Sequence, residues 1–386
     1  MNTIKKKKIL ILHTNYLQEG GEDIAVKNEI YFLEKNFEVE SLFFSNKNGG
    51  FIAKLFSLIL FINISNYRIV KKKIESFNPD IIYIHNTWFQ MSLSIFWLIK
   101  KYNRIALVKL HNYRILCTMS YLQKNHLNNR NICPACGMLN NNSIFNKYYT
   151  NSYLKSLFIV HHSKKLYKIL KNNKIKIMAL NNFQIQQLKD LGLQENNIFL
   201  FPNFLNFNQI ATSSDFNYKY YVYAGRVSKE KGVEELIISF LNAKLDDCKL
   251  KIVGDGPDRN TLEQKYSSEN IVFLNQLNNQ QTLQIINGSL GVLTATKLYE
   301  VQPNVLCEAS TLKIPCVFPN SGGMKEYFPV NYPYIFKQYD YEDLTSKIKK
   351  LYFDNDSKKL GIENFNFLQP LLNEKSLISK FENAIK

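Results

Sequence analysis

Short apolar segments alternate with longer segments of helical spacing along nearly the whole chain. Residues 23–33 have apolar positions four and three apart, which predicts a helix. The alternation is typical of an α/β protein built from strands and crossover helices. In the first half, strands are predicted at residues 8–13, 37–44, 79–85, 104–110, 176–180 and 198–201.

The alternation begins again in the second half, with a predicted helix at residues 234–242. Residues 204–218 are polar and lack periodicity, which predicts a linker near residues 205–217. A chain of 386 residues is also too long for one ordinary core. We therefore expect two Rossmann-like domains with a catalytic cleft between them. The strands of the second half are predicted at residues 220–224, 249–253, 271–274, 290–293 and 315–318.

The net charge of +17 lies in the first half of the chain. Residues 1–200 hold 28 Lys+Arg and 11 Asp+Glu, whereas residues 201–386 hold 21 of each. No acidic residue occurs from Ile81 to Lys189, a stretch with 16 basic residues. Such a field attracts polyanions, for example nucleic acid, anionic lipid headgroups or phosphorylated substrates. A solvated basic face is the alternative interpretation.

The sequence also bears on the compartment. No segment has the roughly 18 consecutive apolar residues that a membrane-spanning helix needs. The lysines at residues 5–8 precede only four apolar residues, whereas a secretory signal needs an apolar stretch of about 7–15. The six cysteines are too few for a disulfide scaffold in a chain of this length. Together these features predict a cytoplasmic protein.

Two glutamates in the second half are candidates for sugar binding. Glu300 and Glu308 stand eight residues apart, and a helix is predicted to begin near Asn304 between them. A helix N-terminus offers free N–H groups and a positive dipole end, which suit a diphosphate. Carboxylates accept hydrogen bonds from pairs of sugar hydroxyls. Two glutamates at this spacing are equally compatible with a solvated helix face.

Two glycine-containing turns precede the glutamates. Gly225 ends a predicted strand and is followed by Arg226 and Lys231, two cations that could neutralise a leaving diphosphate. Gly254 and Gly256 lie in a tight turn after the next strand, for which we predict a structural role beneath the nucleotide.

Taken together, these segments resemble the retaining glycosyltransferases of family 4, which have the GT-B fold. That family has a G-R-x-x-x-x-K-G segment, a G-x-G-P turn and an E-x7-E motif in this order. Residues 322–326 are similar to its following G-G-x-x-E turn. Residues 20–23 resemble its glycine loop after the first strand, and residues 202–203 its P-N before the linker. The resemblance therefore covers nearly the whole chain.

The resemblance implies an N-terminal acceptor domain (residues 1–205) and a nucleotide-sugar donor domain (206–365). A C-terminal helix (366–386) would pack back toward the first domain. It also implies retaining, metal-independent transfer from a nucleotide sugar, such as a UDP- or GDP-sugar, to a glycan or lipid-linked acceptor. No cofactor is expected, and bacterial surface polysaccharide synthesis is the suggested pathway.

Donor-binding roles are carried over from the family. Arg226 and Lys231 would hold the diphosphate, while Glu308 would bind the ribose hydroxyls and Glu300, as a catalytic residue, the donor sugar. Backbone contacts to phosphate or sugar are implied at Gly20, Gly21, Asn304 and Val305.

In the first domain the resemblance singles out His111, which follows a predicted strand. It would lie close to the transferred sugar as a catalytic residue, and a hydrogen-bonded structural histidine is the alternative. Acceptor contacts are expected at Asp23, Asn86 and Arg114. The implied mechanism is front-side displacement, in which the leaving diphosphate takes the proton of the incoming hydroxyl and no protein nucleophile is needed.

A departure from the family concerns metal. Cys117, Cys133 and Cys136 form a C-x15-C-x2-C pattern, whereas some relatives have a fourth cysteine where this chain has residues 146–149. Three thiolates could hold zinc with a histidine as the fourth ligand. Buried free thiols or a degenerate site are the preferred interpretation, and no metal is expected. The candidate fourth ligands are His126, His161 and His162.

Residues 51–73 combine apolar and aromatic positions with Arg68 and the lysines at 71–73. They predict either an amphipathic helix on an anionic membrane surface or an ordinary crossover helix. The family's lipid-linked acceptors favour peripheral membrane contact.

Three other functions are alternatives to glycosyl transfer. A dinucleotide-dependent enzyme needs a G-x-G-x-x-G after a strand, which neither glycine turn completes. A nucleic-acid-binding protein is supported only by the basic first half, without any recognised motif, so no nucleic acid is expected. A GT-B epimerase or a non-transferring nucleotide-sugar-binding protein would use the same donor pocket. The joint presence of the candidate catalytic and donor-binding side chains favours transfer.

Overall fold

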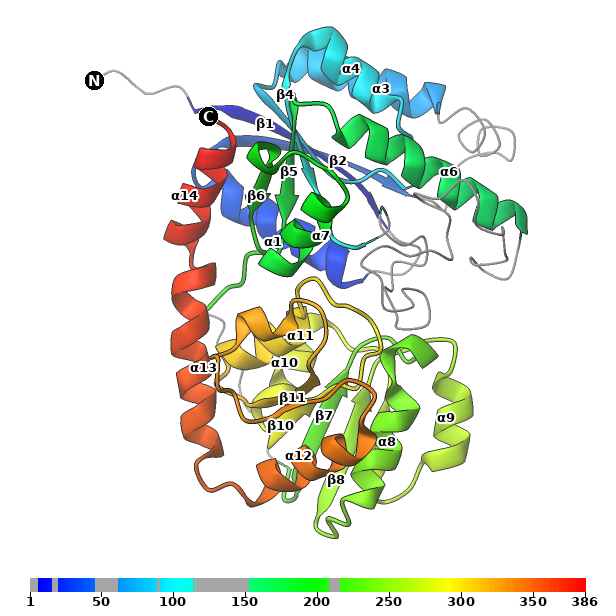
Figure 1. The fold of residues 1–386 in the computed structure, drawn as a ribbon, viewed down its shortest axis with the longest axis vertical. Coiled ribbons are helices and arrows are strands. Elements are labelled where there is room, and N and C mark those ends of the chain that lie inside the picture. The colour runs from blue at the N-terminus through cyan, green and yellow to red at the C-terminus, as the bar shows by residue number, and fades with distance from the viewer. Residues whose placement is uncertain are drawn as a thin grey trace. The chain divides into compact units, whose positions relative to one another are not determined.

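The computed structural model describes residues 6–15, 20–45, 62–88, 91–113, 115, 153–207 and 216–386. The chain forms two compact units (Figure 1). Unit 1 consists of Met1–Phe204 together with Glu374–Lys386, and unit 2 of Leu205–Asn373. The division after Phe204 lies next to the predicted boundary at residues 205/206. The return of the chain to unit 1 comes later than predicted, at Glu374 rather than residue 366.

Unit 1 is built on a six-stranded sheet in the order β2-β1-β3-β4-β5-β6, with every pair of neighbours parallel. The central strands β1 and β3 are almost continuously apolar, as expected for parallel strands covered on both faces. The strands are β1 (Lys8–Asn15), β2 (Glu38–Ser45), β3 (Ile81–Asn86), β4 (Ile105–Lys109), β5 (Ile175–Ala179) and β6 (Ile198–Leu200).

The C-terminal helix α14 (Glu374–Ala384) completes the core of unit 1. Its Phe381 ring lies 5.4 Å from that of Phe37, 5.6 Å from Tyr83 and 5.5 Å from Phe201. Residues 366–373, predicted to belong to this segment, instead end helix α13 of unit 2. The other helices of unit 1 are α1 (Gly21–Glu34), α3 (Ile64–Phe77), α4 (Ile95–Tyr102), α6 (Tyr153–Leu170), α7 (Asn182–Asp190) and the 3-10 turn η1 (Glu195–Asn197).

Unit 2 has a second six-stranded parallel sheet, in the order β12-β11-β10-β7-β8-β9. Its strands are β7 (Lys219–Ala224), β8 (Cys248–Val253), β9 (Ile271–Leu274), β10 (Gly291–Leu293), β11 (Cys316–Pro319) and β12 (Ile335–Phe336). Its helices are α8 (Val233–Asn242), α9 (Arg259–Tyr266), α10 (Asn279–Asn287), α11 (Asn304–Thr311), α12 (Tyr341–Phe353) and α13 (Ser357–Leu372), with 3-10 turns η2 (Lys229–Lys231) and η3 (Met324–Tyr327).

The strand orders fix where each unit can bind a ligand. Strand order reverses between β1 and β3 in unit 1, and between β7 and β10 in unit 2. In open parallel sheets the loops leaving the carboxyl ends of the two strands diverge at such a switch point and leave a crevice. The predicted α/β class with two Rossmann-like domains is confirmed, and all eleven predicted strands are present within two residues at each end.

A charged cluster lies within the core of unit 1. The Lys109 ammonium on β4 is 2.5 Å from the Glu29 carboxylate on α1, and both side chains are completely buried. The Tyr83 hydroxyl on β3 donates to the same carboxylate at 2.5 Å. Because α1 packs on the sheet next to β1 and β2, the Glu29 side chain can extend to Tyr83 on β3 and to a lysine on β4 that is 80 residues away in sequence.

We expect Lys109→Met to lower the free energy of unfolding by about 3–5 kcal/mol, because it leaves the Glu29 carboxylate buried without its cation. Urea unfolding followed by circular dichroism measures this change. The double variant Lys109→Met/Glu29→Gln should regain most of the stability, since no charge is then buried. Equal destabilisation of the single and double variants would contradict the pairing.

Candidate functional site

The loops at the unit 2 switch point bring Lys231 and Glu300 together. Lys231 follows β7 and Glu300 follows β10, and the ammonium nitrogen lies 2.6 Å from a carboxylate oxygen. The Thr296 hydroxyl donates to the same oxygen at 3.0 Å. Both charged side chains are partly exposed, so the pair can still meet a ligand. The two residues to which the resemblance gives diphosphate and sugar contacts are thus direct neighbours.

Gly232 allows this close approach. Its φ of +66° is in the left-handed region, and a Cβ at this position would lie 2.1 Å from the carbonyl oxygen of Ala295. Any other residue would push the loop after β7 away from the loop after β10. The glycine of the G-R-x-x-x-x-K-G segment therefore sets the distance between Lys231 and Glu300.

The glycine turn after β8 packs against the start of the same loop. A Cβ on Gly254 would lie 2.0 Å from the carbonyl oxygen of Gly225, and one on Gly256 would lie 2.2 Å from that of Val227. Val227 N–H donates to the Asp255 carbonyl at 2.9 Å. The turn thus supports the backbone that carries Arg226, whose side chain is exposed.

Glu308 lies on α11, one turn beyond Asn304 and Val305 at the helix start. Its carboxylate accepts a hydrogen bond of 3.1 Å from the Asn279 side chain of α10. Burial raises the pKa of Glu308 to about 7, and the bond from Asn279 opposes the shift only partly. Glu300 and Glu308 therefore have different partners and different environments.

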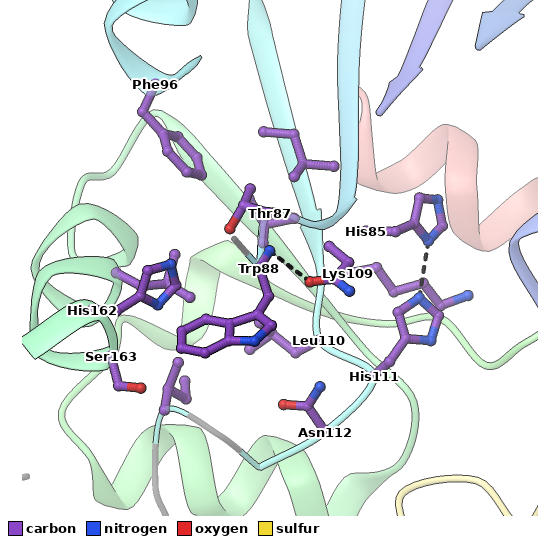
Figure 2. Close-up of a pocket in the computed structure, with 15 residues that line it drawn as sticks. His85, Thr87, Trp88, Phe96, Lys109, Leu110, His111, Asn112, His162 and Ser163 are labelled. Carbon is purple, nitrogen blue, oxygen red and sulfur yellow. Dashed lines mark hydrogen bonds between the residues drawn. The ribbon is translucent and has the colours of Figure 1, made fainter. Parts of the chain in front are cut away.

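Unit 1 has a small pocket at the carboxyl ends of β3 and β4, where Trp88 and His111 lie (Figure 2). Its interior of about 50 Å³ holds a few water-sized groups, so a substituent of a sugar fits but a whole ring does not. Asn86 borders the pocket, and its side chain links the end of β1 to the loop that leaves β3. Its amide donates to the Thr14 carbonyl at 3.0 Å and accepts from the Trp88 N–H at 2.8 Å.

Asp23 is at the first turn of α1 and is 2% exposed. Its carboxylate lies 2.8 Å from Nε2 of His13 and accepts a hydrogen bond of 2.8 Å from the Gly20 N–H. These contacts fix Gly20 and Gly21 at the start of the helix. The acceptor roles of Asp23 and Asn86 stay predictions, since the described contacts of both residues are structural.

His13 and His85 were not singled out from the sequence, although both lie at the carboxyl ends of central strands. His85 Nδ1 is 2.9 Å from Nε2 of His111. The signal available in the sequence was a polar residue at the end of an apolar run. The contact between His85 and His111, however, depends on which strands are neighbours in the sheet. Sequence alone does not give that order.

Several predicted residues lie outside the described part of the chain: Arg114, Cys117, His126, Cys133 and Cys136. Within the described ranges no three His, Cys, Asp or Glu side chains are grouped so as to hold a metal ion. The described cysteines, Cys248, Cys307 and Cys316, are buried and free. None of the described helices is long and apolar enough to cross a membrane.

Residues 207–364, most of unit 2, match the family model described as glycosyl transferases group 1. The sulfoquinovosyl transferase SQD2 of Arabidopsis thaliana is 24% identical over 144 residues, covering 36% of this chain and 28% of that protein. The putative teichuronic acid biosynthesis glycosyltransferase TuaC of Bacillus subtilis is 35% identical over 107 residues, covering 28% and 26%. The matched region thus spans about a quarter of each relative's length.

Among solved structures, Anabaena HepE in complex with UDP and glucose has a TM-score of 0.70 at 14% identity. The match covers 98% of this chain and 99% of that one. At this identity the likeness shows the fold, which is GT-B as the resemblance implied. The match of residues 207–364 to glycosyl transferases group 1 agrees with the glycosyltransferase resemblance over that region, whereas membership of family 4 and retention at the anomeric carbon stay predictions.

The raised pKa of Glu308 makes stability depend on pH. The pKa of Glu308 in the folded protein, about 7, exceeds the ordinary value of 4.5. The stability that protonated Glu308 contributes is therefore fully present below pH 4.5 and is lost as the pH rises through 7. Glu308→Gln removes this loss, and we expect its melting temperature to exceed the wild type's by about 2–4 °C near pH 8 but not near pH 5. Thermal unfolding at both pH values measures it. The exposed Glu269→Gln is the control, and an equal shift at both pH values in Glu308→Gln would contradict the assignment.

Proposed function

Because residues 207–364 match glycosyl transferases group 1 and the chain has the GT-B fold, we propose that this protein transfers a sugar from a nucleotide-sugar donor to a glycan or lipid-linked acceptor. The proposal includes retention at the anomeric carbon and no catalytic metal. The observation that carries it is the Lys231–Glu300 pair at the switch point of unit 2. The names of TuaC and of HepE with UDP and glucose support a UDP-sugar donor and a role in surface polysaccharide synthesis.

The ion pair suggests how the donor is recognised. In the free protein the Lys231 ammonium is neutralised by Glu300. A bound diphosphate competes for the ammonium, which releases the Glu300 carboxylate to accept hydrogen bonds from the donor sugar. Thr296 keeps the carboxylate in place during this exchange, since its hydroxyl donates to the oxygen that faces Lys231. Free protein and donor complex therefore use the same two charges in different pairings.

The other donor contacts follow from the loops and α11. The exposed Arg226 supplies a second cation for the diphosphate, and α11 directs its positive end toward it from Asn304 and Val305. The Asn304 N–H donates to the Gln302 carbonyl at 3.0 Å in the free protein and would exchange this partner for the ligand. Glu308, ionised above pH 7, would bind the ribose hydroxyls. As the bond between the anomeric carbon and the diphosphate oxygen breaks, the acceptor oxygen bonds to the same face of the carbon and the diphosphate leaves with the bonding electrons. Its proton passes to the departing phosphate oxygen, so no protein nucleophile is consumed.

We assign the acceptor to unit 1. His111 would lie at the transferred sugar, and the pocket beside Trp88 would take a substituent of the acceptor or donor. Gly20 and Gly21 at the start of α1 keep their predicted backbone contacts to phosphate, and the Gly20 N–H would exchange the Asp23 carboxylate for the phosphate when the donor binds. Arg114 keeps its predicted acceptor role.

A surface on α3 and α4 supports contact with an anionic membrane. The two helices lie side by side (Figure 1). Exposed apolar side chains, Ile69 and Trp97, occur there beside the exposed cations Arg68, Lys72 and Lys100. Apolar groups that protrude among lysines are typical of peripheral membrane contact. Lys71 and Lys73, which the sequence also suggested for membrane contact, form ion pairs with Glu75 and Glu40.

The donor site is tested first by nucleotide binding. We expect one of UDP, GDP or ADP, or a derived nucleotide sugar, to raise the melting temperature without added metal, because selective binding to the folded state stabilises it. Lys231→Ala and Glu300→Ala should each lower turnover by about 10²–10³-fold with the fold intact.

Lys229→Ala is the matched control, since Lys229 is exposed on the same 3-10 turn and lies outside the family pattern. Full turnover in Lys231→Ala and Glu300→Ala would remove both assignments. A shift by nucleic acid, with none by any nucleotide, would overturn the proposed function.

Membrane contact is tested by co-sedimentation with anionic vesicles. Arg68→Gln/Lys72→Gln/Lys100→Gln should weaken binding about 10²-fold, because each cation near such a surface contributes about 1 kcal/mol. Trp97→Ser should weaken it further through lost apolar burial. Lys349→Gln/Lys350→Gln, which removes exposed lysines of unit 2, controls for charge alone. Undiminished sedimentation of the α3/α4 variants would eliminate this surface.

A further inference from the structure

His85 and His111 form a hydrogen-bonded pair at the carboxyl edge of the unit 1 sheet. His85 lies near the end of β3 and is 6% exposed, and its Nδ1 is 2.9 Å from Nε2 of His111. The ring centroids are 5.2 Å apart with 26° between the planes. Figure 2 marks the contact with a dashed line. In such a bond one imidazole donates and the other accepts, so the pair has a direction.

Both rings are neutral near pH 7. Burial is the main reason that the pKa of each histidine is well below its ordinary value. The neighbouring His111 lowers the pKa of His85 further, and Lys109 and His13 act on both rings in the same direction. Two neutral imidazoles carry two protons on four nitrogens. With one proton in the shared bond, only two arrangements are possible.

The surroundings of the second nitrogen of His85 distinguish the two proton arrangements. Its Nε2 is buried and has no hydrogen-bond partner in the described part of the chain. If His111 donated through Nε2, His85 would carry its own proton on Nε2 and bury an N–H group without an acceptor, which is rare in folded proteins. If His85 donates through Nδ1, its Nε2 has only a lone pair. The positive potential of Lys109, which acts on this ring, favours the lone pair.

We propose that His85 donates its Nδ1–H to His111 and so holds His111 in the Nδ1–H tautomer. His85 is then a positioning residue. The lone pair on Nε2 of His111 is occupied, so His111 offers a hydrogen-bond donor and is not a base. The consequence for chemistry rests on the proposed function: a hydroxyl or carboxylate oxygen of the donor sugar or acceptor receives this bond. The proton of the incoming hydroxyl passes to the leaving phosphate, which needs no protein base.

The tautomer is measured by nuclear magnetic resonance of the full-length protein with ¹⁵N-labelled histidine. The His111 signals are assigned by their loss in His111→Asn. We expect His111 to carry its proton on Nδ1 in the wild type. A proton on Nε2 of His111 overturns the proposal, whether or not the protein transfers sugar.

Two substitutions at His85 test whether this residue sets the tautomer of His111. Asn places a side-chain N–H where His85 has Nδ1, whereas Phe keeps a ring without a donor. His85→Asn should preserve the Nδ1–H tautomer of His111, and His85→Phe should give a mixture. An unchanged tautomer in His85→Phe overturns the role of His85. If His85→Phe does not fold, the His111 tautomer in the wild type and in His85→Asn still tests whether His85 donates to His111.

Kinetics separate positioning from a general structural role. Once a donor and acceptor are identified, His85→Phe should lower kcat about 10²-fold, as expected for loss of an aimed donor, with KM little changed. His85→Asn should recover most of kcat. Because Asn also mimics an Nδ1–H donor at position 111, His111→Asn should lose less kcat than His111→Leu. Equal losses in those two variants would count against a donor role, and the tautomer measurement stays independent of activity.

Discussion

The parallel direction of every strand pair is the constraint on which both candidate sites depend. Since the carboxyl ends of parallel strands share one edge, each unit collects its functional side chains there, although they are far apart in sequence. In unit 2, Lys231 and Glu300 are 69 residues apart and still form an ion pair. In unit 1, His85 and His111 meet in the same way across neighbouring strands. The reversal of strand order then leaves room for a ligand beside these residues.

The regular parts of the fold were predictable because burial on both faces makes parallel strands continuously apolar. Strand β9 was predicted at the observed residues, and the others differ by at most two at either end. Strand β12 was missed because it has only two residues, too few to show a strand pattern. Residues 366–373 were assigned to the returning segment, whereas α13 ends at Leu372 and the chain returns to unit 1 only after Asn373.

The candidate site of unit 2 was predictable from motif order, but the contacts between its residues were not. In the sequence Gly232 is recognisable only as part of a motif. The structure shows that the carbonyl oxygen of Ala295 occupies the space that a side chain at this position would need. In unit 1, the sequence did not single out Lys109 or Glu29. Their complete burial depends on the Glu29 side chain of α1 reaching Lys109 on β4, a relation between distant segments that periodicity does not encode.

The buried Lys109 connects the stability of unit 1 to its chemistry. The acid-free stretch from Ile81 to Lys189 cannot neutralise this lysine, and Glu29 from an earlier helix supplies the missing charge. With that partner the ammonium can stay inside the core, where it lowers the pKa of both His85 and His111. Removing the lysine would therefore change more than packing, because the positive charge that Glu29 stabilises adds to the effect of burial in keeping the histidine pair neutral. A neutral pair is what allows one histidine to fix the proton of the other.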